Sequence, residues 1–133
     1  MLDNYLIKEA LKARELSYSP YSHFKVGAAL LTKDGQIYLG ANIENSSYPL
    51  SMCAERNTLY NAYMHEVKKE DIISLAIVGD TIEPISPCGA CRQVMSELMP
   101  NNAKIIMSNL KGDVLIKRVD ELLPLAFKKE DLK

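Results

Sequence analysis

The segments SMCAER (residues 51–56) and SPCGAC (residues 86–91) flank the apolar run IISLAIV (residues 72–78). Each cysteine segment is predicted to begin a helix, and the run between them is typical of a strand that is covered on both faces. A helix, a buried strand and a second helix in this order indicate the α/β class. If the strands between them run parallel, the N-termini of both helices converge at one end of the sheet, where α/β proteins tend to bind ligands.

The segments outside this unit extend the pattern in both directions. Turn-forming residues at 17–22, 34–35 and 111–113 separate the elements. We predict three helices: over residues 3–17, from Ser51 or Met52 onward with Ser51 as the N-cap, and over 88–99. We predict strands over residues 24–31, 37–41, 72–78, 104–108 and 114–117. Residues 42–51 are predicted to form an ordered polar loop. The order α-β-β-α-β-α-β-β predicts a mixed five-stranded sheet with helices on its faces.

The composition is that of a globular protein, and a length of 133 residues suits a single domain over residues 1–133. The formal net charge is -1, which excludes the basic field of a nucleic-acid-binding protein, so we expect no nucleic-acid partner. Charged residues interrupt the N-terminal sequence MLDNYLIKEALKAREL throughout, which argues against a signal peptide and against a membrane anchor or partner. Three cysteines fit a disulfide framework poorly and favour the reducing cytoplasm.

All three cysteines belong to the two opening segments, and their spacing predicts a zinc site. Cys88 and Cys91 stand three residues apart, which directs both sulfurs to one side of a first helical turn, and Cys53 is predicted to lie in the first turn of the preceding helix. The partial positive charge at helix N-termini favours the thiolates that bind metal. Because catalytic zinc takes three protein ligands and one water, we expect these three thiols to hold a Zn2+ ion.

Two charged residues follow Cys53 closely. Glu55 is the candidate catalytic residue, since it can reach a metal-activated water and transfer its proton without ligating the metal. Arg56 is placed to offset the excess thiolate charge through hydrogen bonds to the sulfurs. A Cys-x-x-Cys pair alone also occurs in redox proteins and structural zinc sites. The combination of Cys-x-Glu with a later Pro-Cys-x-x-Cys matches the known signature of zinc deaminases.

Beyond the cysteines, the chain resembles the small homotetrameric cytidine deaminases over approximately residues 18–127. Four segments carry the resemblance: YSPYSHFKVGAAL (18–30), NIENSSYPLSMCAER (42–56), SPCGACRQV (86–94) and ELLPLAF (121–127). The resemblance implies a three-layer α/β/α sandwich with one Zn2+ per subunit. It also implies hydrolytic deamination of cytidine and deoxycytidine to uridine and deoxyuridine, with release of ammonia, in pyrimidine salvage.

The same resemblance assigns residues to the recognition of a small pyrimidine nucleoside. Asn42 and Glu44 would hydrogen-bond the ribose 3′-hydroxyl, and Phe24 would pack against the pyrimidine ring. The backbone of Ala54, together with Glu55, would recognise the edge of the base. Without the resemblance, Phe24 suits a core position, and Asn42 and Glu44 suit a solvated loop.

The resemblance further implies that neighbouring subunits of a homotetramer complete each site. Phe127 matches the C-terminal aromatic residue that the family contributes across the interface. Tyr48 and the backbone near Ser46 are expected to contribute in the same way. In a monomer, Tyr48 and Phe127 would be ordinary packing residues.

Other functions remain open. An aminonucleoside-antibiotic deaminase of the same fold, acting on a blasticidin-type substrate, is disfavoured by the loop NIEN (42–45), which suits a ribose 3′-hydroxyl. A nucleic-acid-editing deaminase is disfavoured by the near-neutral charge. A non-catalytic zinc-stabilised binding module is disfavoured by Glu55, because a structural site needs no such carboxylate and usually closes with a fourth protein ligand.

Two further features bear on these expectations. His23 and His65 are predicted to be surface or hydrogen-bonded structural residues, because three thiols already fill the protein share of a catalytic zinc site. The residues Asn57-Thr58-Leu59 depart from the family, where a more apolar run is usual. We expect this departure to alter helix packing between subunits and to leave the chemistry unchanged.

Overall fold

The computed structural model describes residues 2–132, which contain four α-helices and five β-strands. The helices are α1 (Leu2–Arg14), α2 (Ala54–Met64), α3 (Gly89–Leu98) and α4 (Val119–Leu122). The strands are β1 (Val26–Thr32), β2 (Ile37–Ala41), β3 (Ile72–Gly79), β4 (Lys104–Asn109) and β5 (Val114–Arg118). This order confirms the predicted succession of elements and adds the short helix α4 after the last strand.

The five strands form one mixed sheet in the order β2-β1-β3-β4-β5. Strands β3 and β4 run parallel, whereas the other neighbouring pairs are antiparallel. Val26 lies opposite Gly79, and Gly27 lies opposite Ala41. The start of β1, the end of β2 and the end of β3 therefore lie at the same end of the sheet. We call this row of strand ends the site edge.

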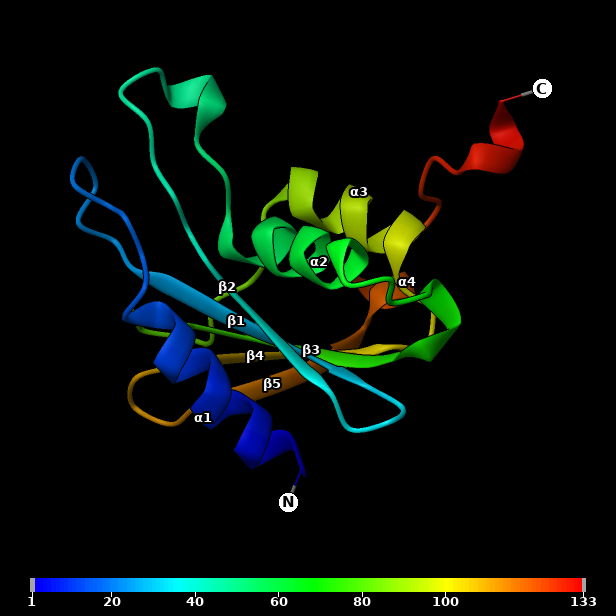
Figure 1. Cartoon of the computed structure of the whole chain (residues 1–133), viewed down its shortest axis with the longest axis horizontal. Helices are drawn as coiled ribbons and strands as arrows, with labels where there is room; N and C mark the ends of the chain where they lie inside the picture. The colour runs from blue at the N-terminus through cyan, green and yellow to red at the C-terminus, as the bar shows by residue number, and fades with distance from the viewer. Residues whose placement is uncertain (1, 133) are drawn as a thin grey trace.

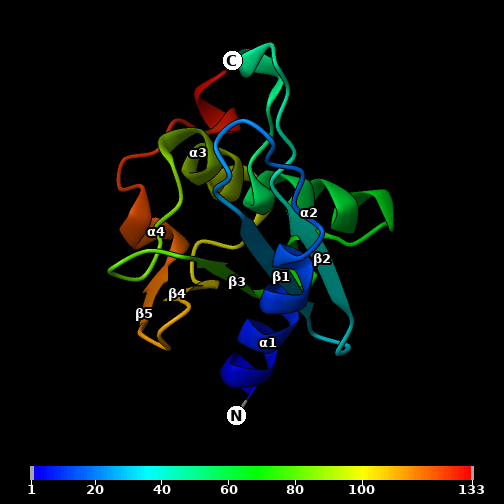
Figure 2. The ribbon, with the colours of Figure 1, turned by 90° about the vertical axis from the view of Figure 1, so that its left-hand side faces the viewer.

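The elements form three layers, as the family resemblance implies. Helix α1 covers one face of the sheet, and α2 and α3 lie side by side on the other (Figures 1 and 2). Helix α4 continues from β5 and packs beside α3. Helices α2 and α3 therefore lie on the same face of the sheet, where their N-terminal ends can lie close together.

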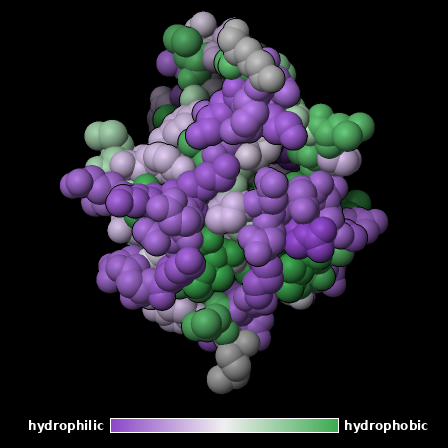
Figure 3. All heavy atoms as spheres, turned by 90° about the vertical axis from the view of Figure 1, so that its right-hand side faces the viewer, coloured by the Kyte–Doolittle hydropathy of each residue, from purple (hydrophilic) through white to green (hydrophobic). Residues whose placement is uncertain are grey.

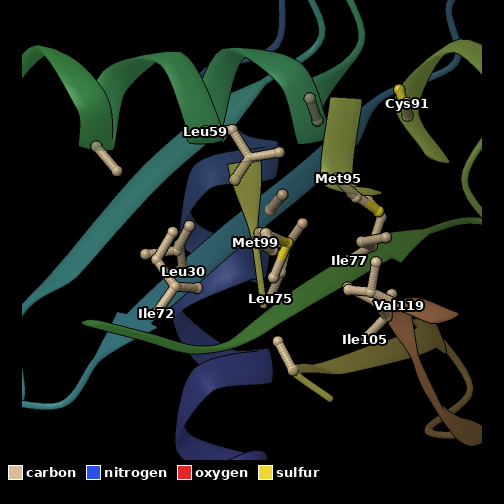
Figure 4. Close-up of a cluster of buried hydrophobic side chains, with 14 of the residues drawn as sticks. Leu30, Leu59, Ile72, Leu75, Ile77, Cys91, Met95, Met99, Ile105 and Val119 are labelled. Carbon is tan, nitrogen blue, oxygen red and sulfur yellow. The ribbon is translucent and has the colours of Figure 1, made fainter. Parts of the chain in front are cut away.

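Two hydrophobic clusters, one on each face of the sheet, hold the layers together. Along β1 and β3, successive side chains point to opposite faces, as strand geometry requires. Leu30, Leu75 and Ile77 join the cluster beneath α2 and α3, where Leu59 and Met95 also lie (Figure 4). The cluster beneath α1 contains Leu6, Ala10, Ala29, Leu31, Ala76, Val78 and Ile106. The central strand β3 is thus buried on both faces, as its continuous apolar run predicts.

Helix α2 begins later than the sequence predicts. Cys53 occupies the N-cap with φ −73° and ψ 154°, so it precedes the first turn, and Ser51 is extended rather than a cap for this helix. The reason lies in Met52, whose backbone N–H and C=O are both bonded to Ile43 across an isolated bridge. Because Met52 is held as a short strand partner, the helix starts at Ala54.

The first strand also begins later than expected, at Val26. His23 has a φ of 58°, a left-handed conformation that breaks an extended chain. The N–H of Phe24 bonds to the hydroxyl of Ser22, at 3.0 Å. Phe24 therefore lies in the loop ahead of the strand, and its ring is partly exposed rather than a core side chain.

The molecular surface is mixed in character. Figure 3 shows the face on the right-hand side of Figure 1, where hydrophilic side chains dominate and apolar side chains form separate patches. Within residues 2–132, every helix is too short or too polar to cross a lipid bilayer.

Candidate metal centre and active site

Three cysteines meet where helices α2 and α3 begin. Cys53 is the N-cap of α2 and Cys88 is the N-cap of α3, both with extended backbone and neither with a side-chain capping hydrogen bond. Cys91 lies in the first turn of α3. The backbone N–H groups and the positive end of each helix dipole therefore surround the thiols and favour their ionised form.

The separations of the sulfur atoms fit a tetrahedral metal. The Sγ atoms of Cys53 and Cys88 are 3.8 Å apart, and those of Cys88 and Cys91 are 3.4 Å apart. All three lie within 4.8 Å of one another. Zinc–sulfur bonds of about 2.3 Å in a tetrahedral site place the sulfurs about 3.8 Å apart. The donor set and its spacing thus fit Zn2+, with small adjustments of the side chains.

The burial of the three cysteines differs, and the difference leaves one side of the cluster accessible. Cys91 is buried, Cys53 is half-buried and Cys88 is exposed. The cluster contains neither His23 nor His65, and the Nδ1 atom of His65 is 2.8 Å from the carbonyl oxygen of Asn61. Three protein ligands with an open side are the arrangement of catalytic rather than structural zinc.

Arg56 contacts the cluster as its spacing predicts. Its Nη2 atom donates a hydrogen bond of 3.5 Å to Cys53 Sγ. The hydrogen bond from Cys91, together with that from Arg56, lowers the pKa of Cys53 to about 5, although burial opposes the shift. The same interaction with Cys53 raises the pKa of Cys91, and burial acts in the same direction. Arg56 Nε is buried without a hydrogen-bond partner in residues 2–132.

Glu55 lies in the first turn of α2, next to the cluster, and is only 5% exposed. Burial raises the pKa of its carboxyl group to about 7, and the nearby charge of Cys53 adds to the shift. A group that titrates near neutrality can both accept and return a proton, which is what general acid–base catalysis requires. Ala54, which precedes it, is fully buried at the start of α2.

Asn42 lies at the site edge and ties β2 to the segment before β1. Its Oδ1 accepts hydrogen bonds from the backbone N–H of Val26, at 2.9 Å, and from the hydroxyl of Ser17, at 2.5 Å. Its Nδ2 donates to the carbonyl oxygen of Phe24, at 2.7 Å. The amide therefore has one defined orientation, beside the backbone of Phe24.

Glu44 and Asn42 flank Ile43, whose backbone connects them to the metal ligands. Ile43 pairs with Met52 on one side and with Tyr18 on the other. Met52 directly precedes Cys53, so backbone hydrogen bonds join the 42–44 loop to the first zinc ligand. The Glu44 carboxylate accepts hydrogen bonds from the segment 21–22.

Phe24 reaches the end of the central strand. A Cβ atom placed on Gly79 would lie 3.5 Å from Phe24 Cζ, so the ring packs over the last residue of β3. Strand β3 leads through residues 80–87 to Cys88. Phe24, Asn42 and the first turns of α2 and α3 thus belong to one end of the molecule.

Two of the predicted substrate-binding residues lie apart from the sulfur cluster. Tyr48 is 72% exposed in the 3-10 helix Tyr48–Leu50 and contacts Tyr21 edge to face, with ring centroids 6.5 Å apart. These two tyrosines, with Glu44, line a hollow of about 240 Å³. Phe127 is 57% exposed, and its carbonyl oxygen accepts a 2.8 Å hydrogen bond from Gln93. Residues 123–126 line a hollow with Ser96 of α3, and the C-terminal segment then projects away from the rest of the molecule (Figure 1).

The structure also reveals residues near the site that the sequence did not single out. Ser17 and Ser22 bond to Asn42 and Glu44, although both serines were expected only to form a turn. The sole sequence signal was their place in the segment YSPYSHF, which carries part of the family resemblance. Asn57 bonds to the backbone of β2 and marks the departure from the family pattern.

Comparisons with known proteins agree with this geometry. A family model described as "Cytidine and deoxycytidylate deaminase zinc-binding region" matches residues 1–107. The cytidine deaminase of Halalkalibacterium halodurans is 55% identical, covering 96% of this chain and 95% of the relative. The cytidine deaminase of Sporosarcina psychrophila is 52% identical, covering 96% and 92%.

Solved structures give the same result. The crystal structure of a cytidine deaminase from Burkholderia pseudomallei superposes with a TM-score of 0.94 at 47% identity, covering 96% of this chain and 100% of that one. The cytidine deaminase from Mycobacterium tuberculosis superposes with a TM-score of 0.79 at 35% identity, covering 93% and 95%. The chain therefore belongs to the cytidine and deoxycytidylate deaminase family.

Proposed function

We propose that this protein is a zinc-dependent hydrolase that converts cytidine and deoxycytidine to uridine and deoxyuridine with release of ammonia. One observation carries the proposal: three thiols converge at two helix N-termini beside Glu55, a buried carboxyl group with a pKa near neutrality. A structural zinc site needs no such group. The high identity to curated cytidine deaminases supports the choice of substrate.

The protein groups divide the chemistry between them. Cys53, Cys88 and Cys91 would hold the metal. When bound, zinc supplies a Lewis acid that lowers the pKa of a coordinated water toward about 7. Glu55 takes a proton from the attacking water and delivers it to N3 of the pyrimidine ring. It then takes the second proton from the hydroxyl group newly formed on C4 and delivers it to the amine that leaves C4. Arg56 offsets part of the thiolate charge through its hydrogen bond to Cys53.

Recognition of the nucleoside is assigned to the loops at the site edge. Asn42 and Glu44 would hold the ribose 3′-hydroxyl, and Phe24 would contact the pyrimidine ring. The backbone of Ala54 would read the base edge next to Glu55. Asn42 accepts a hydrogen bond from the backbone N–H of Val26 and donates one to the carbonyl oxygen of Phe24, which supports this grouping, because these bonds tie the proposed sugar-binding and base-binding residues together.

We further propose that the active form is a homotetramer whose subunits share their sites through Tyr48, the backbone near Ser46, and Phe127. Tyr48 and Phe127 are large and exposed, as residues that become buried in an interface are in an isolated chain. The buried Arg56 Nε lacks a partner among residues 2–132, and unsatisfied buried donors are rare. An acceptor from a neighbouring subunit would satisfy it.

The wider assignment follows from the same features. We propose that residues 1–133 act as one domain in pyrimidine salvage in the cytoplasm. All three cysteines are free thiols rather than disulfides, and a reducing compartment keeps thiols available for metal.

Ultraviolet absorbance of cytidine tests the proposed reaction directly. Zinc-loaded protein is expected to deaminate cytidine and deoxycytidine in preference to blasticidin, CMP and a cytosine oligonucleotide. A chelator should abolish the activity and added zinc should restore it. Glu55→Gln should retain zinc and lose about 10²–10⁴-fold in turnover. No absorbance change with any compound of this panel would overturn the proposal in favour of a zinc-stabilised binding module.

Mixed tetramers test whether subunits share their sites. Glu55→Gln lacks the proton carrier, whereas Phe127→Ala lacks the aromatic residue that a neighbour would supply. Unfolded together and refolded, the two variants should form sites that combine an intact Glu55 with an intact Phe127 from another subunit. Activity above the mean of the separately refolded variants supports sharing. Activity equal to that mean would show that Phe127 acts within its own chain or not at all.

A further inference from the structure

Ser22 and its neighbour Tyr21 bind the carboxylate of Glu44, one of the proposed sugar-binding residues. The Ser22 hydroxyl donates to Glu44 Oε2. Its backbone N–H donates to Glu44 Oε1, at 3.1 Å, and the N–H of Tyr21 donates to the same oxygen, also at 3.1 Å. Both oxygens of the Glu44 carboxylate are therefore engaged, which prevents the group from rotating.

The orientation of the Ser22 hydroxyl is itself determined. A serine hydroxyl offers one donor and two acceptor sites, and it normally rotates to suit its surroundings. Here the N–H of Phe24 donates to Ser22 Oγ, at 3.0 Å. Because His23 between them has a φ of 58°, the chain folds back and brings this N–H to the oxygen. With the acceptor side occupied, the hydroxyl hydrogen points at Glu44.

The charge of Glu44 follows from the same contacts. The hydrogen bond from the Ser22 hydroxyl lowers the pKa of Glu44, and the backbone donors of Ser22 and Tyr21 and the charge of His23 act in the same direction. Glu44 therefore stays ionised in a fixed position at neutral pH. An ionised carboxylate held in this way is a strong, directional acceptor for a hydroxyl group.

We propose that Ser22 is a positioning residue for the sugar: its hydroxyl orients the Glu44 carboxylate to accept a hydrogen bond from the 3′-hydroxyl of the nucleoside. The proposal rests on the sugar-binding role of Glu44 in the proposed function. Ser22 need not touch the substrate. It acts through Glu44, and its effect depends on the presence of the 3′-hydroxyl group.

Steady-state kinetics with cytidine and 3′-deoxycytidine separate this role from a structural one. Ser22→Ala should raise the KM for cytidine about tenfold, the size expected for a lost hydrogen bond to a charged group, with little change in kcat. The same substitution should leave the KM for 3′-deoxycytidine nearly unchanged, because that substrate offers Glu44 no hydroxyl. Ser22→Thr retains the hydroxyl and should restore the wild-type KM.

Two further variants make the outcome interpretable. Ser96→Ala is the control, since it also removes a serine hydroxyl group, whose 2.7 Å hydrogen bond goes to Gln93 O on α3; it should change neither KM. Ser22→Cys keeps nearly the same size with a weak donor and should show an intermediate penalty. It also serves if Ser22→Ala does not fold.

Two results would overturn the proposal, and they differ from failure of the proposed function. An equal penalty on both nucleosides would give Ser22 a general structural role, and no penalty on either would give it none. If Glu44→Ala raises the two KM values equally, the sugar-binding role of Glu44 itself is wrong. If wild-type protein deaminates no nucleoside, the proposed function fails before Ser22 is considered.

Discussion

Asn57 Nδ2 donates a hydrogen bond of 2.8 Å to the carbonyl oxygen of Ala41. One helical turn later, Asn61 Nδ2 donates a 3.0 Å hydrogen bond to the carbonyl oxygen of Leu39. Side chains of α2 thus satisfy the backbone of β2, an edge strand whose outer carbonyl groups have no neighbouring strand. Helix α2 starts beside Cys53 and carries Glu55, and β2 leads into Asn42, so these bonds join the helix of the proposed catalytic residue to the proposed sugar-binding loop.

Asn57→Ala should reduce stability. The Ala41 carbonyl group is largely buried and would lose its donor, which costs about 1–2 kcal/mol. Urea unfolding of the zinc-loaded protein measures the effect. Asn102→Ala is the control, because Asn102 is exposed and should change the free energy of unfolding by less than about 0.5 kcal/mol. Equal effects of the two substitutions would contradict the role of the Asn57 bond.

Gly40→Ala should also destabilise the contact between α2 and β2. A Cβ atom at this position would lie 2.5 Å from the backbone nitrogen of Thr58, and that backbone cannot move without shifting α2. Overpacking of this kind costs about 1–3 kcal/mol, again measurable by urea unfolding. At Gly89, where a Cβ atom meets nothing within 4 Å, alanine should be tolerated. Comparable losses at both positions would mean that the close approach at Gly40 is not responsible.

Arg56→Ala should weaken the metal centre. The substitution removes the hydrogen bond to Cys53 Sγ and the positive charge next to the thiolates. Residues that support metal ligands typically contribute about 10- to 100-fold in metal affinity or activity. Zinc affinity by competition with a chelator and kcat/KM for cytidine are the measurements. Arg118→Ala, at an exposed arginine paired with Asp120, is the control. If both quantities stayed at wild-type values, Arg56 would have no part in the centre.

Acid should erase the contribution of the bond between Ser22 and Glu44 to stability. The pKa of Glu44 is lower in the folded than in the unfolded state, so the carboxylate stabilises the fold fully above the unfolded value of about 4.3. The contribution is lost as pH falls below that value and through the folded pKa. The difference in unfolding free energy between wild type and Ser22→Ala, both with chelator present, should shrink in this window. A difference that stays constant or grows on acidification would contradict the assignment.

Much of the fold follows from local sequence patterns. The apolar run at 72–78 predicts a strand buried on both faces, and β3 is the central strand of the sheet. The turns predicted at residues 34–35 and 111–113 are present, and Gly35 and Gly112 within them both adopt a positive φ. The cysteine spacing predicts the cluster because ligands at the start of a helix, in the N-cap or the first turn, have few possible directions.

What escaped prediction depends on contacts between distant segments. The start of α2 was misplaced because Met52 pairs with Ile43, and no local pattern reveals that bridge. Likewise, the polarity of Asn57 looked like a departure from the family pattern, whereas the side chain satisfies a carbonyl group in β2. Ser22 was expected only to form a turn, because its partner Glu44 is 22 residues away. The contributions of Tyr48 and Phe127 to neighbouring subunits stay predictions.

Cysteines 53 and 88 stand where helices usually have a serine, threonine or aspartate, yet neither thiol makes a capping hydrogen bond. The helix starts of α2 and α3 therefore lack the side-chain acceptor that normally protects such ends from fraying. Metal binding would keep the thiols deprotonated, and the thiolates would place negative charge at the starts of both helices. Folding and zinc occupancy are therefore coupled. We therefore expect zinc starvation to shorten the lifetime of the protein in the cell, because frayed segments are where proteases cut, and to lower its abundance as well as its activity.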